Sequence, residues 1–239
     1  MQLDHKRNTR YFTGATMGRL STICWIVAIA CAVLLFLRIW WVYWLAGVVG
    51  LTSVICAIVF STHSVSDSEY EGTCSGLNKA FRTRLTEFIN AELNKNNGRG
   101  KAPVAVDEEK IRYSRSFLYG NDTLMRVGQD GRRRTGKLSF AAYYLDKTRL
   151  FVGYEMFGLV SEAHEEVFGV YPFESIESIE AFRPEGLSPL ADYSRVSIKL
   201  KEKKTPIEFW RANDAELDEL LANVRSHLTS EPAQDATEE

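Results

Sequence analysis

The chain has 239 residues, of which 25% are charged, and its formal net charge at pH 7 is -2. This length allows one soluble domain beside an apolar segment, and the slightly acidic balance argues against a nucleic-acid-binding protein. Three of the four cysteines lie within the apolar segment, so no disulfide framework is indicated and a reducing compartment is favoured.

Residues 20–60 form an apolar stretch that is too long for one membrane-spanning helix. A helix of that length would measure about 60 Å, twice the roughly 30 Å of a bilayer's hydrocarbon core. Its one charged residue, Arg38, is followed by aromatic residues of the kind that favour the headgroup level: Trp40, Trp41, Tyr43 and Trp44. We therefore predict a transmembrane helical hairpin, with helices at about residues 20–37 and 42–60 and with Arg38 and these aromatic residues as interface anchors.

The flanking charges predict the orientation of this hairpin. The basic residues before and after it are Lys6, Arg7, Arg10 and Arg19, then Lys79, Arg82 and Arg84. Because cytoplasmic flanks are enriched in Lys and Arg, both termini are expected in the cytoplasm, with the chain integral to a bacterial inner membrane. Gly47 and Gly50 offer a small-residue face for helix contact, within one chain or between chains.

The segment after the hairpin, residues 61–105, is expected to be a connector that contains one amphipathic helix at residues 77–93. An apolar stripe at helical spacing indicates this helix: Leu77, Phe81, Leu85, Phe88, Ile89 and Leu93. The helix could lie on the membrane surface, or it could pack on the following domain or on a partner copy.

Residues 106–228 change to the alternating pattern of short antiparallel strands. Strands are expected at residues 138–144, 150–156, 166–171, 178–182, 196–200 and 207–209. Asn213, with Glu216 three residues later, forms a capping-box pattern that predicts a closing helix at residues 214–228. Residues 229–239 are acidic and expected to be disordered. The predicted fold class is α+β.

The order of these segments resembles the bacterial PH-like and GRAM-like domains. The segments that carry the resemblance are YYLDKTRLFVGYEMF, EEVFGVYPFESIESIEAF and RVSIKLKEKKTPIEFW, followed by the terminal helix. The middle one contains the family's Pro-x-x-x-Ile-x-x-Ile pattern, here from Pro172 to Ile179. The resemblance implies a bent antiparallel sheet or β-barrel capped by the C-terminal helix, a role in binding lipid or protein, and no catalysis.

No motif for catalysis, a metal or a cofactor is present in the sequence. The four histidines are scattered, and Gly98 to Lys101 fails the phosphate-loop pattern. Glu162, Glu165 and Glu166 surround His164 in an expected loop, where a solvated loop is the more usual interpretation. We therefore predict no enzyme, no metal site and no cofactor.

A cluster of basic residues in the loop GQDGRRRTGK is the main candidate site. Its members are Arg126, Arg132, Arg133, Arg134 and Lys137. Guanidinium groups donate paired hydrogen bonds to phosphate, so these residues are a candidate site for lipid headgroups. The alternative is an exposed loop whose charge serves solubility or topology.

Three functions remain open on these observations. The first is a membrane-anchored, non-catalytic PH-like module that binds membrane lipids or a protein partner and scaffolds a membrane complex. The second is a two-helix membrane effector whose β domain senses a nucleotide-like ligand and drives homo-oligomerisation. The third is an enzyme with an unrecognised site, for which the sequence offers no candidate residues.

Overall fold

The computed structural model describes residues 3–35, 40–63, 65–95, 103–120, 123–183 and 192–229. These residues divide into two compact units, which we call the helical unit and the sheet unit. The helical unit consists of Met1–Cys74 with Leu124–Gly136, and the sheet unit of Ser75–Thr123 with Lys137–Glu239. The segment Leu124–Gly136 therefore interrupts the sequence of the sheet unit but belongs to the helical unit.

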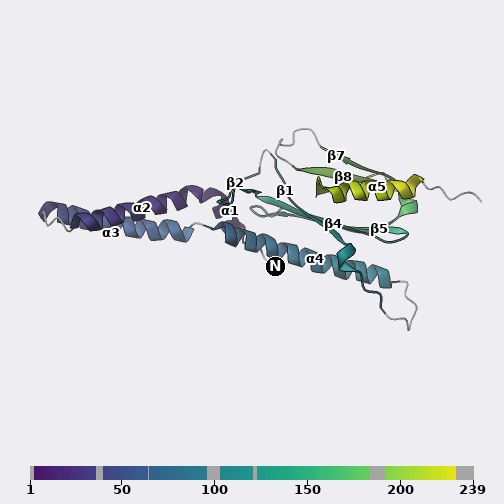
Figure 1. Cartoon of the computed structure of the whole chain (residues 1–239), viewed down its shortest axis with the longest axis horizontal. Coiled ribbons are helices and arrows are strands. Elements are labelled where there is room, and N and C mark those ends of the chain that lie inside the picture. Colours follow the sequence, from purple (N-terminus) through teal and green to yellow (C-terminus); the bar gives the residue numbers. More distant parts are fainter. Residues whose placement is uncertain are drawn as a thin grey trace, which may run out of the picture. The chain divides into compact units, whose positions relative to one another are not determined.

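The helical unit is dominated by two long apolar helices. Its elements are α1 (His5–Thr13), α2 (Ala15–Leu34), α3 (Trp40–His63), the first turns of α4 (Asp67–Asn94), β2 (Met125–Val127) and β3 (Arg133–Thr135). Helices α2 and α3 lie side by side (Figure 1). Small residues allow this contact: a Cβ added at Gly50 would lie 3.1 Å from Cβ of Cys31, and Oγ of Ser21 donates a hydrogen bond to the carbonyl of Ala57. Gly47 has nothing within 4 Å of such a Cβ and does not take part in the contact.

Both predicted apolar helices are confirmed, with bounds shifted by a few residues. Met17–Leu34 and Val42–Ser61 are long and apolar enough to cross a membrane. Only 17% and 11% of these two windows are buried, so most of the surface of both helices is exposed in this chain. Arg38 and the side chains of Trp40 and Trp41 lie outside the described residues, whereas Tyr43 and Trp44 are exposed in the first turn of α3.

Helix α4 begins about ten residues earlier than the sequence pattern predicts, within the expected connector. A capping box starts it: the backbone N–H of Ser66 donates to Glu69, and the N–H of Glu69 donates to Oγ of Ser66. Tyr70 and Cys74 extend the buried apolar stripe toward the N-terminus. The Ser- and Thr-rich composition around them gave no sign of this extension in the sequence.

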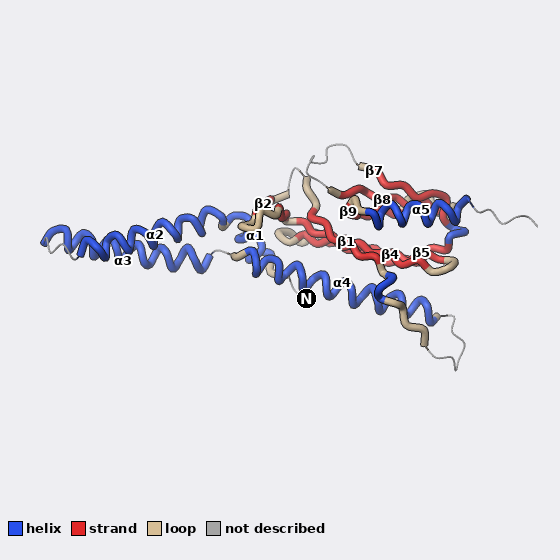
Figure 2. The backbone as a smooth tube through the Cα atoms, viewed as in Figure 1, coloured by secondary structure: helices blue, strands red, loops and turns tan. Residues whose placement is uncertain are grey.

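The sheet unit contains two antiparallel sheets and a C-terminal helix. Figure 2 colours the strands red and the helix α5 blue. The first sheet has the order β1 (Arg112–Phe117), β4 (Lys137–Leu145), β5 (Arg149–Gly158), β6 (His164–Pro172). The second has the order β7 (Ile176–Phe182), β8 (Tyr193–Leu200), β9 (Ile207–Ala212). Short 3-10 turns lie at Glu108–Lys110 and Phe173–Ser175, and α5 (Ala215–Thr229) closes the unit. The predicted antiparallel strands and closing helix are thus confirmed.

Strand β5 is buried on both faces of the first sheet. Its alternate side chains point to opposite faces and show what covers each face. Leu150, Val152 and Tyr154 point into the core shared with the second sheet and α5. The intervening residues face α4, which approaches so closely that a Cβ at Gly153 would lie 2.5 Å from Cδ1 of Leu85. The first sheet is therefore covered by α4 on one face and by the second sheet on the other.

Two local predictions in the sheet unit are corrected by the structure. The cap of α5 is Asp214, whose carboxylate accepts the N–H of Leu217, and not Asn213. Glu216 does not complete a capping box; it accepts a hydrogen bond from the buried guanidinium of Arg211 at 2.9 Å. His164 and Glu166 lie in strand β6 and not in a loop, because β5 and β6 continue pairing as far as Phe157 and His164.

Candidate functional site

The basic segment singled out in the sequence forms a short antiparallel hairpin. Met125 pairs with Thr135 and Val127 with Arg133 across the β2 and β3 strands. Gly131 in the connecting turn has a φ of 73°, a conformation that glycine adopts without steric cost. The hairpin turn thus presents its arginines at defined positions instead of on an irregular loop.

Arg134 fixes this hairpin to the start of α4. Its side chain is 2% exposed, and Nε lies 2.9 Å from Oε1 of Glu71 while Nη2 lies 2.7 Å from Oδ2 of Asp130. The hydrogen bonds from Arg134 hold the pKa of Asp130 well below its usual range, and the pKa of Arg134 is raised by Asp130 and Glu71 despite burial. Arg134 therefore serves the internal packing of the helical unit.

A second set of contacts joins the hairpin to α1. The hydroxyl of Tyr11 donates to Oδ1 of Asp67 at 2.8 Å, and the backbone N–H of Gln129 donates to Oδ2 at 2.6 Å. Arg126 donates to the Tyr11 carbonyl at 2.6 Å and lies 4.4 Å from the centroid of its ring. Burial, with the hydrogen bond to Asp67, raises the pKa of Tyr11 to about 12. Burial would raise the pKa of Asp67, but these hydrogen bonds and nearby arginines lower it.

The predicted basic residues thus fall into three groups. Arg126 and Arg134 face inward, and Arg132 and Arg133 are exposed on the hairpin turn and β3. Lys137 begins β4 and belongs to the sheet unit. The side chain of Arg132 is 81% exposed, and it forms a long ion pair of 3.8 Å with Asp130. Arg132 and Arg133 are therefore the members of the cluster available to a phosphate.

The sequence did not identify four residues of this site: Tyr11, Asp67, Tyr70 and Glu71. Tyr70 donates its hydroxyl proton to the Thr135 carbonyl at 2.7 Å, and its ring stacks on that of Tyr11 with centroids 4.2 Å apart. The capping-box spacing from Ser66 to Glu69 was the one sequence signal for a helix here. No local pattern could pair that helix with a hairpin more than fifty residues later.

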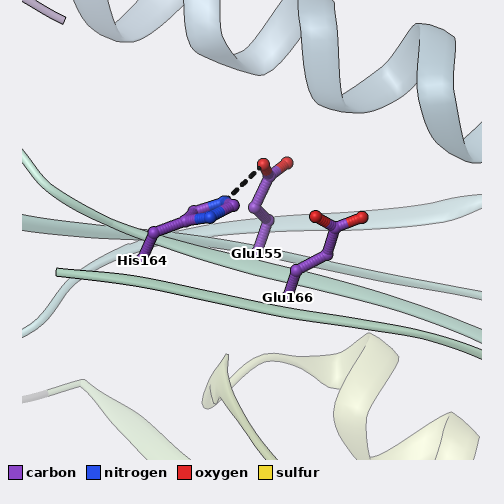
Figure 3. Close-up of side chains that lie close together, drawn as sticks. All are labelled: Glu155, His164 and Glu166. Atoms are coloured by element: carbon purple, nitrogen blue, oxygen red, sulfur yellow. Dashed lines mark hydrogen bonds and ion pairs between the residues drawn. The ribbon is translucent and has the colours of Figure 1, made fainter. Parts of the chain in front are cut away.

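A second polar group lies in the sheet unit, on the side of β5 and β6 that faces α4. Figure 3 shows Glu155, His164 and Glu166 close together, and their ligand atoms lie within 4.8 Å of one another. The fully buried carboxylate of Glu155 accepts a hydrogen bond from Arg84 at 2.6 Å and lies 2.9 Å from Nε2 of His164. Because the positive charge of Arg84 opposes a divalent cation, we interpret the group as an ion-pair cluster that holds α4 on the sheet.

A polar cleft of about 500 Å³ lies between α4 and β1 in the sheet unit. Lys79 and Arg82 line it together with Glu87 and Glu108, and the guanidinium of Arg82 lies 4.0 Å from the centroid of the Tyr113 ring. These opposite charges balance one another. If the β domain senses a nucleotide-like ligand, this cleft is a candidate site for it in the sheet unit.

Comparison of the chain with protein-family models, with curated proteins and with solved structures found no match.

Proposed function

We propose that the chain is an integral membrane protein with a PH-like β domain, and that its β2–β3 hairpin binds anionic lipid headgroups at the membrane surface. The PH-like assignment is supported by the layout of a four-stranded and a three-stranded antiparallel sheet followed by a helix. The function is that of a non-catalytic module, which holds a membrane complex together through lipid or protein contacts.

The membrane assignment is supported by what the two long helices leave exposed. Large apolar side chains of α2 and α3 point outward, among them Ile26, Ile29, Leu45 and Leu51. Exposing such a surface to water would be costly, and a bilayer removes that cost. The basic flanks then favour cytoplasmic termini, as the sequence alone predicts.

The observation that carries the headgroup proposal is the ion-pair network of Arg134. This network fixes the hairpin to the start of α4, which follows α3 directly, while Arg126 joins the hairpin to α1, which precedes α2. The hairpin is therefore tied to the segments next to the ends of both candidate spans. Arg132 and Arg133 are thereby kept within reach of headgroups whenever the helices are inserted.

The expected energy is modest and suits a domain that is already anchored. Each cation near an anionic leaflet contributes about 1 kcal/mol, so Arg132 and Arg133 together contribute about 2 kcal/mol, or roughly 30-fold in occupancy. This energy is too small to recruit a protein from solution but sufficient to orient one that a membrane hairpin holds at the surface.

The test is lipid retention by the full-length protein, measured by native mass spectrometry after extraction from vesicles of mixed phosphatidylglycerol and phosphatidylethanolamine. The variant R132Q/R133Q should retain less phosphatidylglycerol than the wild type, and less still as salt is raised. The control K203Q/K204Q removes the same charge from the exposed β8–β9 turn. Equal loss in both variants would refute a specific role for the hairpin.

A further inference from the structure

The helical unit contains a polar cleft of about 910 Å³. It is bounded by the start of α2, the start of α4 and the β2–β3 hairpin, all within that unit. Sites for small molecules commonly have volumes of about 300–1,000 Å³, so the cleft is large enough for a lipid headgroup.

The charges that line the cleft balance one another. The cations are Arg19, Arg126 and Arg134, and the anions are Asp67, Glu71 and Asp130. Arg134 is held by Glu71 and Asp130, and Arg126 is held by Tyr11. A net-neutral lining favours a ligand that carries both charges over one that is purely anionic.

Arg19 and Asp67 are the members of this lining best able to bind such a ligand. Arg19 is exposed, and no partner for it occurs among the residues that the structure describes. Asp67 remains ionised at neutral pH and accepts two hydrogen bonds, whereas a carboxylate can accept about four. The hydroxyls of Ser66 and Ser68, 3.0 Å apart at the same helix start, are hydrogen-bonded to each other, so one of them can still donate to a ligand.

The position of the cleft indicates where the ligand comes from. Gly18, Arg19 and Thr22 line it and also belong to the first turns of the candidate span Met17–Leu34. The neighbouring side chains Leu20 and Ile23 are exposed and apolar. A headgroup in the cleft would thus leave its acyl chains against α2, at the depth where lipid tails begin.

We infer that the cleft binds the headgroup of a zwitterionic phospholipid with a primary ammonium, its phosphodiester on Arg19 and its ammonium on Asp67. The inference rests on the proposed membrane insertion but not on Arg132 or Arg133. The same chemistry occurs in free glycerophosphoethanolamine, so the source of the ligand has to be tested as well.

Two variants of the full chain address the site in different ways. R19Q removes the cation, and G18L fills the cleft sterically, because a Cβ at Gly18 has nothing within 4 Å. Their matched controls are R10Q, an exposed arginine of α1 outside the cleft, and G47L, a glycine of α3 with equally open surroundings.

Retention of phosphatidylethanolamine by each variant is measured by native mass spectrometry. R19Q should lower it about tenfold, the effect of losing one charged hydrogen bond. G18L should also lower it, because the leucine side chain occupies the cleft, while both controls retain the wild-type value. Wild-type retention in R19Q and G18L would overturn the proposal. Binding of soluble glycerophosphoethanolamine to the detergent-solubilised protein without retention of the lipid would overturn the lipid source.

Failure of the underlying membrane assignment would be seen separately. If alkaline carbonate released the wild-type protein from membranes, the insertion itself would be wrong. If R132Q/R133Q lost phosphatidylglycerol while R19Q retained phosphatidylethanolamine, only the cleft would be refuted.

Discussion

Replacing Arg134 with glutamine should release the β2–β3 hairpin from α4. The Arg134 side chain is 2% exposed and that of its partner Glu71 is 32% exposed. Removing one member of a fully buried ion pair costs about 3–5 kcal/mol. Glu71 can regain water, so we expect a smaller cost of about 2 kcal/mol, which raises the population of the undocked hairpin about 30-fold.

Hydrogen exchange of the full-length protein in lipid nanodiscs measures this opening directly. The backbone N–H of Gln129, which donates to Asp67, and that of Gly136, which donates to the Leu124 carbonyl, are protected only while the hairpin is docked and formed. R134Q should speed exchange of the peptide that contains them, whereas R133Q, an exposed arginine of the same strand, should not. Equal exchange rates in the two variants would refute the anchoring role.

Three further predictions follow from other contacts. E155Q should destabilise the sheet unit by about 1–3 kcal/mol, measured by urea unfolding, because a buried carboxylate loses its charge beside Arg84; an unchanged midpoint would contradict the ion-pair interpretation. G50L should lower the melting temperature in detergent, since its Cβ would meet Cys31 at 3.1 Å, and G47L should not; identical shifts would contradict the helix contact. Because the folded-state pKa of Asp67 is lowered, its contribution to docking should be complete above the ordinary value of 3.8 and be lost as pH falls below it toward the folded-state pKa. Hydrogen exchange corrected for intrinsic rates should therefore show loss of protection only in acid, and loss near neutrality would contradict this assignment.

The parts of the fold that local periodicity specifies were predictable from the sequence. The apolar helices, the paired strands β4 and β5 and the closing helix α5 all follow from alternation or helical spacing over many residues. The start of α4 was missed because Ser, Thr and Glu dominate its first turns, although the capping box at Ser66 marks it. Only Tyr70 and Cys74 extend the buried apolar stripe into these turns, and two apolar residues among polar ones do not form a recognisable helical pattern.

The site was predictable only as a set of residue types. The sequence identifies Arg132, Arg133 and Arg134 as neighbours but cannot distinguish the buried one from the exposed ones. That distinction depends on Glu71, which is far away in the chain and reaches Arg134 only in the folded unit. Long-range pairing of this kind leaves no periodic signal in a single sequence.

Because the β2–β3 hairpin lies within the sequence of the sheet unit, neither unit corresponds to one continuous fragment of the chain. A fragment that begins at Ser75 would retain Leu124–Gly136 without Tyr11, Asp67 or Glu71, and the carboxylate of Glu71 would be missing from Arg134. Binding studies on such a fragment would report on Arg134, which the whole protein keeps buried. Excising Leu124–Gly136 from that fragment and joining Thr123 to Lys137 through a short glycine linker also removes the hairpin that has lost these partners. We expect that excised fragment to be the more soluble of the two.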